Sequence, residues 1–332
     1  MRPAEPSWRD PRVAVARVLR RPEPREEPAA LQGEAAARCA ALTRAAQAGG
    51  PRLAWLAAPA PRSGSNFIEA LAAAGGGLAT APLGLAEAAV LAEGGRLEAF
   101  RAGLAARHAS AAGLEAEAWL GFALAGFARA AAVRHGTEAV LLKDPQARGL
   151  ARAVCAAPEA RLILVLRDGR RVVDSALRTW PKRGLRRWLG RSLADHADEW
   201  ARGTEALLDL ADARPEAMAL RYEAAASDPV AASARLRAHL GLPRAPEAAV
   251  AAAAGRLLGS SRLAAQGGAV DWRPRARPDG YDPAGREVDW PASWERTFER
   301  VAGDAARRLA DALPASGVAA KRTSHAPAMA AE

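Results

Sequence analysis

Residues 53–71 read LAWLAAPAPRSGSNFIEAL. The first six are apolar, the next six form a loop that ends at Gly64, and the last seven have the spacing of an opening helix. A strand, a glycine-bearing loop and a helix start together point free backbone N–H groups at a phosphate. Gly64 lets the backbone approach an anion closely, and Arg62, Ser63 and Ser65 add side-chain donors. The stretch therefore predicts an anion-binding turn.

The same loop differs from the phosphate loop of nucleoside-triphosphate enzymes. Residues 59–66, PAPRSGSN, lack the Gly-x-x-x-x-Gly-Lys-Ser/Thr spacing and have no lysine at the helix start. By itself the sequence is also compatible with an ordinary turn between a strand and a helix. The loop thus indicates an anion site without naming the ligand.

A second stretch has the same organisation. Residues 161–166, RLILVL, are typical of a strand that is covered on both faces. Arg167 follows at the strand tip, and Ser175 comes about two helical turns into the next segment, where it could meet Arg167 across a shared anion. Two anion sites at the ends of two parallel strands suit a ligand with phosphates at two separate positions.

The order of the elements predicts the fold class. Strands are expected at residues 53–58, 138–142, 161–166 and 217–222, and helices at residues 29–48, 65–71, 171–179, 192–211, 229–240 and 294–313, with an interrupted helical region at 86–133. This alternation favours a three-layer α/β/α fold with a central, mostly parallel sheet. Residues 78–85 are expected to form an irregular apolar loop.

Composition sets the domain limits. We expect a flexible N-terminal arm at residues 1–28, because it is rich in proline and charge, one α/β domain at residues 29–313, and a disordered tail at residues 314–332. The arm resembles neither a secretory signal nor a membrane anchor, so the chain is expected to be cytoplasmic.

Charge and metal-ligand counts exclude some function classes. The net charge of +10 comes mostly from arginines spread along the chain, so we expect no nucleic-acid partner. The two cysteines, Cys39 and Cys155, are far apart, and the five histidines lack ligand spacing. No metal is therefore expected.

Taken together with two further motifs, these stretches form an ordered series along residues 53–243. Pro61-Arg-Ser-Gly-Ser-Asn-Phe67 is followed by Lys143-Asp-Pro145, then by Arg167-Asp-Gly-Arg170 with Ser175, and then by Arg221-Tyr-Glu223. An Asp-Pro pair and a helix ending in Leu-Gly-Leu-Pro243 come next. This series resembles the bacterial sulfotransferases that use 3'-phosphoadenosine 5'-phosphosulfate. The resemblance implies their phosphate-loop-like sulfotransferase fold.

The resemblance also assigns roles to residues. Residues that would hold the 5'-phosphosulfate are Arg62, Ser63, Gly64, Ser65 and Asn66, and those that would hold the 3'-phosphate are Arg167 and Ser175. Sulfuryl transfer passes through a loose in-line transition state, so cations around the moving group and the leaving phosphate carry most of the catalysis. Arg62 fits that catalytic role, and Lys143 is a second cation at the neighbouring strand tip.

The general base is the point at which the sequence departs from the family. Some members place a histidine where this chain has Pro145, and others use a glutamate about twenty residues after the first loop. Glu87 is the nearest acid to that position, so it is the expected base, with Asp144 as runner-up. His108 and His135 remain further candidates.

The sequence therefore predicts transfer of a sulfuryl group to a hydroxyl or amine on a small-molecule, sugar or lipid acceptor. Two alternatives stay open, a nucleotide or small-molecule kinase and a catalytically inactive nucleotide-binding protein of the same fold. The basic segment 180–191, with Trp180 and Trp188, is read as a solvated face or as an acceptor lip with peripheral membrane contact. Glu223 is read as a structural residue that bonds loop N–H groups. The oligomeric state is left open.

Overall fold

The sheet in the computed structural model has five parallel strands in the order β2-β3-β1-β4-β5. The structure describes residues 33–80, 106, 116–144, 154, 156–179, 192–257, 275–278, 282 and 287–313. The strands are β1 (Arg52–Ala57), β2 (Leu78–Ala79), β3 (Ala139–Asp144), β4 (Arg161–Leu166) and β5 (Met218–Arg221). The expected parallel sheet is confirmed.

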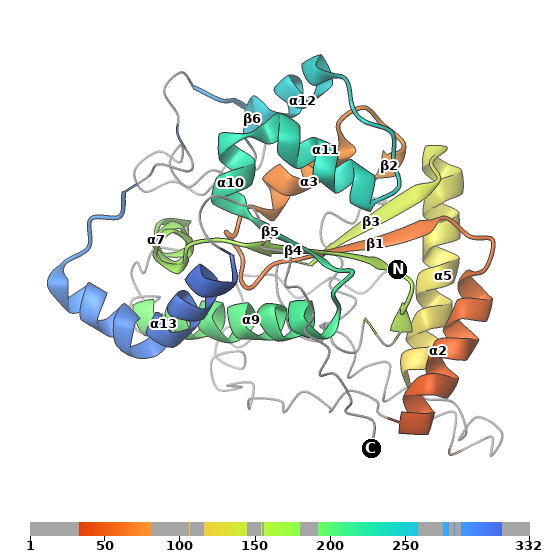
Figure 1. The fold of residues 1–332 in the computed structure, drawn as a ribbon, viewed down its shortest axis with the longest axis horizontal. Coiled ribbons are helices and arrows are strands. Elements are labelled where there is room, and N and C mark those ends of the chain that lie inside the picture. The colour runs from red at the N-terminus through yellow and green to blue at the C-terminus, as the bar shows by residue number, and fades with distance from the viewer. Residues whose placement is uncertain are drawn as a thin grey trace, which may run out of the picture.

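Helices cover both faces of this sheet (Figure 1). They are α2 (Gly33–Gln47), α3 (Ser65–Ala73), α5 (Ala116–His135), α7 (Gly169–Thr179), α9 (Leu193–Ala213), α10 (Tyr222–Ser227), α11 (Pro229–His239), α12 (Glu247–Ala254) and α13 (Ala292–Ala312). A short antiparallel hairpin joins β6 (Arg256–Leu257) and β7 (Arg275–Ala276). The expected three-layer α/β/α fold is confirmed.

The alternation of side chains along β1 divides the core into two halves. Leu53, Trp55 and Ala57 pack with residues of α5, α9 and α13 on one face. Ala54 and Leu56 pack with residues of α3 and α11 on the other. Successive side chains of a strand point to opposite faces, so a strand buried on both sides must be apolar throughout.

Two details of the sequence reading are wrong. Leu78 and Ala79 were expected in an irregular loop, but they pair in parallel with Ala139 and Val140 as the short edge strand β2. Tyr222 was expected in a strand, but it begins helix α10. A two-residue strand carries too little alternation to be recognised. Tyr222 continues the alternation of Met218 and Leu220 past Arg221, the last paired residue of β5.

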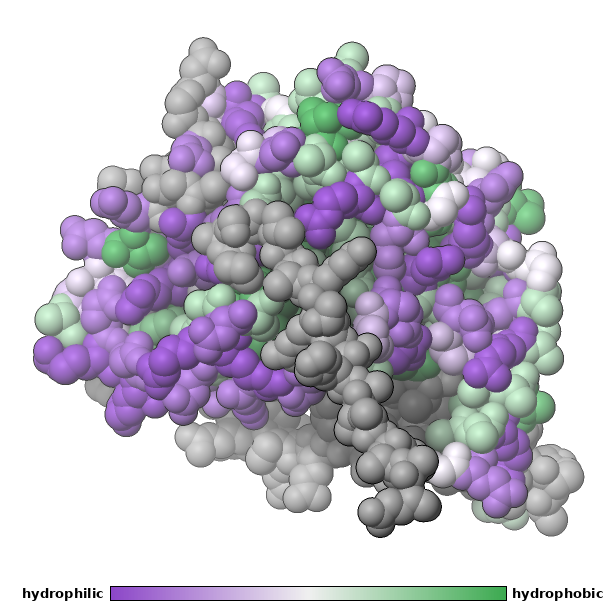
Figure 2. Space-filling view, viewed as in Figure 1, coloured by the Kyte–Doolittle hydropathy of each residue, from purple (hydrophilic) through white to green (hydrophobic). Residues whose placement is uncertain are grey.

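Ion pairs join arginines of α13 to acidic residues of α13 and α9. Figure 2 shows a mainly hydrophilic face over α13 and α9. There Arg308 lies 2.6 Å from Asp209 and 3.5 Å from Asp212, and Arg307 pairs with Glu299 and Asp304. Arginine paired in this way is typical of a solvated face. None of the helices in the described part of the chain is long and apolar enough to cross a membrane.

Helix α11 is tied to the sheet through a histidine, which makes stability depend on pH. The Nε2–H of His239 donates to the Leu162 carbonyl at 3.0 Å. Burial lowers the pKa of His239 below its ordinary value of 6.5; the hydrogen bond to Leu162 opposes this shift and the charge of Arg161 adds to it. In the unfolded chain His239 takes up a proton near its ordinary pKa, whereas in the folded chain it does so only at lower pH. The free energy of unfolding therefore falls as the pH falls below 6.5.

We accordingly expect the midpoint of thermal unfolding to drop more between about pH 7.5 and 5.5 in the wild type than in His239→Gln. The exposed His135 supplies the control, because His135→Gln should keep the wild-type pH dependence. Equal slopes in the wild type and His239→Gln would show that another group controls this response.

Candidate functional site

The loop after β1 lies at the carboxyl edge of the sheet. It begins where the Ala58 N–H donates to the Asp144 carbonyl at 3.2 Å, which holds it against the end of β3. It then turns through two residues with left-handed backbone, Arg62 at φ 81° and Gly64 at φ 92°. Gly64 caps α3, and the first N–H groups of that helix have no partner within the helix. The predicted strand, loop and helix are therefore present as an anion-binding turn would require.

The Ser63 side chain makes a hydrogen bond within the loop. Its hydroxyl donates to the Ala60 carbonyl at 2.7 Å, and the residue is 1% exposed. Because a hydroxyl has one proton, this side chain shapes the loop rather than donating to a ligand. Ser65 and Asn66 occupy the first turn of α3, as predicted.

Tyr222 supports the loop from the neighbouring end of β5. A Cβ atom built on Gly64 would lie 2.2 Å from Cδ2 of Tyr222, so the ring touches the glycine backbone directly. Phe67 packs edge-on against the same ring, with centroids 5.7 Å apart. Gly64 is thus required for its φ angle and for this contact.

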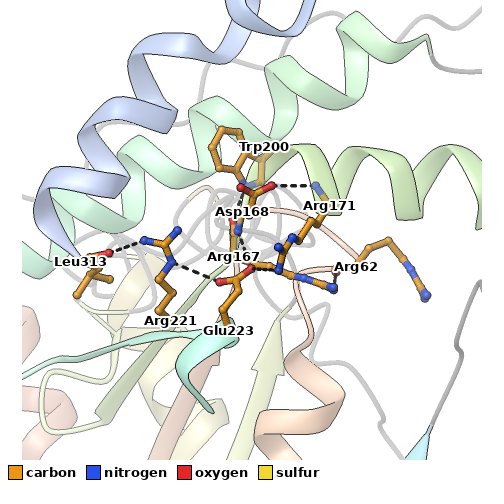
Figure 3. Close-up of polar contacts among 8 residues, drawn as sticks. All are labelled: Arg62, Arg167, Asp168, Arg171, Trp200, Arg221, Glu223 and Leu313. Atoms are coloured by element: carbon orange, nitrogen blue, oxygen red, sulfur yellow. Dashed lines mark hydrogen bonds and ion pairs between the residues drawn. The ribbon is translucent and has the colours of Figure 1, made fainter. Parts of the chain in front are cut away.

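Arg167 links the second stretch to the first loop. Its Nη1 donates to the Arg62 carbonyl at 2.9 Å, and its guanidinium lies 4.2 Å from the centre of the Tyr222 ring. Its own carbonyl accepts a hydrogen bond from Trp200 Nε1 at 3.1 Å. Figure 3 shows Arg167 with Trp200 and Arg62. Arg167 is therefore held in place by contacts with the first loop, the start of α10 and α9.

Ser175 meets Arg62 in this structure. Its Oγ accepts from Nε of Arg62 at 3.2 Å. The sequence placed Ser175 with Arg167 at a separate anion position; the structure joins all three residues, because Arg167 bonds the backbone of Arg62 while Ser175 bonds its side chain. The two predicted anion positions are adjacent.

Lys143 lies at the tip of β3, beside the start of the loop. Its Nζ donates to Asn66 Oδ1 at 2.6 Å and pairs with Glu69 Oε2 at 2.5 Å. Glu69 is a site residue that the sequence reading missed. The available signal was its spacing, since residues three apart on a helix share one side and Glu69 follows Asn66 by three.

The turn after β4 is fixed by Glu223, as Figure 3 shows. Its Oε1 accepts from the Asp168 N–H at 3.2 Å, and its carboxylate pairs with Arg221 at 3.4 Å and Arg171 at 4.0 Å. Arg221 in turn donates to the Leu313 carbonyl at 2.6 Å. The structural reading of Glu223 is confirmed.

The candidate general bases lie at different places. Asp144 is buried at the end of β3, next to Lys143 in the strand and so on the opposite face of the sheet. His135 is exposed at the end of α5, before β3 begins, and therefore lies at the other edge of the sheet from the loop. Glu87 and His108 lie outside the described residues.

Basic side chains gather at the carboxyl ends of the central strands. Arg62, Lys143 and Arg167 contact the loop after β1 or the start of α3, whereas Arg171 lies beside Glu223 at the turn after β4. Ligands of open parallel sheets bind at the carboxyl ends of the strands. Within the part of the chain that the structure describes, no group of three acidic, histidine or cysteine residues could hold a metal ion. The fold and the loop define a parallel α/β protein with a strand–loop–helix turn after β1.

Comparisons with known proteins identify the family. A model of the sulfotransferase family matches residues 59–246, more than half of the 332 residues, so the chain belongs to the sulfotransferase family. The expected membership of the sulfotransferase family is thereby confirmed. A comparison with curated proteins finds no match. Among solved structures, the chain is similar to the sulfotransferase domain from the curacin biosynthetic pathway, with 15% identity, coverage of 77% of this chain and 98% of that chain, and a TM-score of 0.48.

The contact between Gly64 and Tyr222 can be tested by substitution. Gly64→Ala adds a methyl group against the ring and a side chain at a left-handed φ, so we expect the free energy of unfolding to fall by about 2 kcal/mol or more. Urea unfolding measures the change. Gly126→Ala is the matched control, because Gly126 is exposed on α5 and a Cβ there meets nothing within 4 Å. The control should be neutral or more stable by up to about 1 kcal/mol.

Proposed function

We propose that this protein transfers a sulfuryl group from 3'-phosphoadenosine 5'-phosphosulfate to a hydroxyl or amine acceptor. The observation that carries the proposal is the position of Arg62 between Ser175 and Arg167. It makes the loop after β1 and the turn after β4 two halves of one site. The nucleotide has phosphates at both ends of one ribose, and such a ligand needs adjacent anion positions of this kind.

In this proposal each half of the site has its own role. The backbone at the start of α3, with Arg62, Ser65 and Asn66, holds the 5'-phosphosulfate, and Arg167 with Ser175 holds the 3'-phosphate. Ser63 and Gly64 contribute through their backbone, since the Ser63 hydroxyl is used within the loop. Helix N-termini and guanidinium groups both suit such anions.

The transfer itself breaks the bond between sulfur and the bridging oxygen and forms a bond between sulfur and the acceptor oxygen or nitrogen. The electron pair of the broken bond stays on the 5'-phosphate, which leaves as part of adenosine 3',5'-bisphosphate. Arg62 and Lys143 stabilise that negative charge, and a positioned donor of this type contributes about 3 kcal/mol in a transition state. The acceptor proton passes to a general base, for which we propose Glu87, with Asp144 as the alternative.

The proposal also includes the acceptor, the cellular compartment and the absence of other partners. The acceptor is a small molecule, a sugar or a lipid, and the reaction takes place in the cytoplasm without a metal or a nucleic-acid partner. The sequence between residues 180 and 191, which lies outside the described residues, is proposed to border the acceptor. Peripheral membrane contact through the same segment would bring a lipid acceptor to the site.

Ligand binding tests the nucleotide assignment. Adenosine 3',5'-bisphosphate should raise the thermal stability of the protein, whereas ATP should not. Arg62→Ala and Arg167→Ala should each weaken bisphosphate binding by about 10- to 100-fold, as expected for a charged hydrogen bond. Arg202→Ala is the control, because Arg202 is an exposed α9 residue paired with Asp198. Stabilisation by ATP alone, or turnover of ATP with magnesium, would point to a kinase instead.

Transfer of labelled sulfate to a panel of acceptors tests the chemistry. Glu87→Gln should lower turnover by about 100-fold or more while leaving bisphosphate affinity unchanged, as for the loss of a general base. Asp144→Asn is the comparison, and a loss confined to that variant would move the role to Asp144. Tight bisphosphate binding with no transfer to any acceptor would instead identify an inactive nucleotide-binding protein.

A further inference from the structure

Lys143 points toward the helix that follows the first loop. Lys143 is two residues beyond Leu141, which packs in the half of the core next to α3, so the two side chains share a face of β3. In the sheet, Lys143 pairs with Leu56, two residues before Ala58 at the start of the loop. The Lys143 side chain therefore reaches α3 from directly beside the loop.

Two residues of α3 receive the ammonium group. Asn66 Oδ1 and Glu69 Oε2 lie 2.6 Å and 2.5 Å from Nζ of Lys143. The Lys143 side chain is 4% exposed and that of Glu69 is 12% exposed, so water contributes little to this arrangement. An ammonium group has three N–H donors, and the two contacts leave one of them for a ligand.

The Glu69 carboxylate has an electrostatic disadvantage at this position. A negative charge near a site for phosphate opposes binding of that phosphate. The carboxylate can favour binding only through what it does to Lys143, whose long side chain has many conformations when it is not held. Glu69 can therefore affect ligand binding in two ways, through its negative charge and through the hydrogen bond by which its side chain holds Lys143.

We infer that Glu69 is a positioning residue for the 5' side of the nucleotide site. Together with Asn66 it holds the Lys143 ammonium beside the loop, where the remaining N–H meets the 5'-phosphate group. Arg167 and Ser175 serve the 3'-phosphate independently of it. This inference rests on the proposed function, because it takes the site to bind the bisphosphate nucleotide.

Two ligands and two matched variants test it. Adenosine 3',5'-bisphosphate and adenosine 3'-monophosphate differ in the 5'-phosphate, and calorimetry with the full chain gives the affinity for each. Glu69→Asp keeps the charge but shortens the reach, so it should weaken bisphosphate binding by about tenfold, the loss expected for one charged contact. Glu69→Gln removes the charge but keeps an acceptor oxygen at the same reach, so its affinity should equal or exceed that of the wild type. Binding of the 3'-monophosphate should stay within about twofold in both variants.

The variant Lys143→Met gives a second test of the same inference. It should weaken bisphosphate binding as much as Glu69→Asp does, and the double variant should show no further loss, because Glu69 acts through Lys143. Thermal unfolding of each variant shows whether the fold is intact.

Several results would overturn the inference. Unchanged bisphosphate affinity in Glu69→Asp, or an equal loss in Glu69→Gln, would contradict positioning. An equal loss for both ligands would mean that Glu69 serves only to hold α3 against the sheet. Failure of the wild type to bind either ligand would instead reject the proposed function, so the two failures are distinguishable.

Discussion

The contact between the Tyr222 ring and the Gly64 backbone fixes the geometry of the whole edge of the sheet. Tyr222 is 6% exposed and stands where β5 ends, two strands away from β1. Its ring touches the loop after β1 on one side and lies 4.2 Å from the Arg167 guanidinium on another. One aromatic side chain therefore sets the separation between the loop after β1 and the residue that follows β4. Because packed interiors have little free volume, a change at Tyr222 would move both loops together.

Two glutamates pair with the basic residues at the carboxyl ends of the strands. Glu69 pairs with Lys143 beside the first loop, and Glu223 pairs with Arg221 and Arg171 beside the second. Glu223 also accepts a backbone N–H of the turn, so it holds the Arg-Asp-Gly-Arg turn in shape. Glu223 thus holds two arginines close together, and Glu69 holds one lysine, each through charged hydrogen bonds or ion pairs.

The fold was largely predictable because its strongest strands are apolar on both faces. Residues 161–166 were predicted as a strand and form β4 with the same limits, since five consecutive large apolar residues leave no other reading. Helix α9 was placed within two residues, because Ser192 and Asp195 form a capping box at its start. The sequence could not show β2, whose two residues depend on pairing with β3 for their conformation.

The site was less predictable, because its contacts join segments that are far apart in the chain. The motifs placed Arg62, Arg167 and Ser175 at one edge, but sequence spacing cannot tell which of two arginines Ser175 bonds. Glu69 was missed for the same reason, since its role depends on a lysine 74 residues away. Residues on one helix can be assigned to a face from their spacing, but the neighbour on that face comes only from the fold.

Helix α9 contacts both loops of the candidate site from the face of the sheet that it covers. A Cβ atom on Gly203 of α9 would lie 2.1 Å from the Pro59 carbonyl oxygen, so the helix backbone touches the start of the loop. Three residues earlier on α9, Trp200 bonds the Arg167 carbonyl and packs against Phe298 of α13, with ring centroids 5.8 Å apart. Residues three apart share one side of a helix, so a single face of α9 supports both loops. The position of Arg62 relative to Arg167 is therefore set twice, by α9 under the sheet and by Tyr222 at the carboxyl ends of the strands, so the two loops keep a fixed relative position.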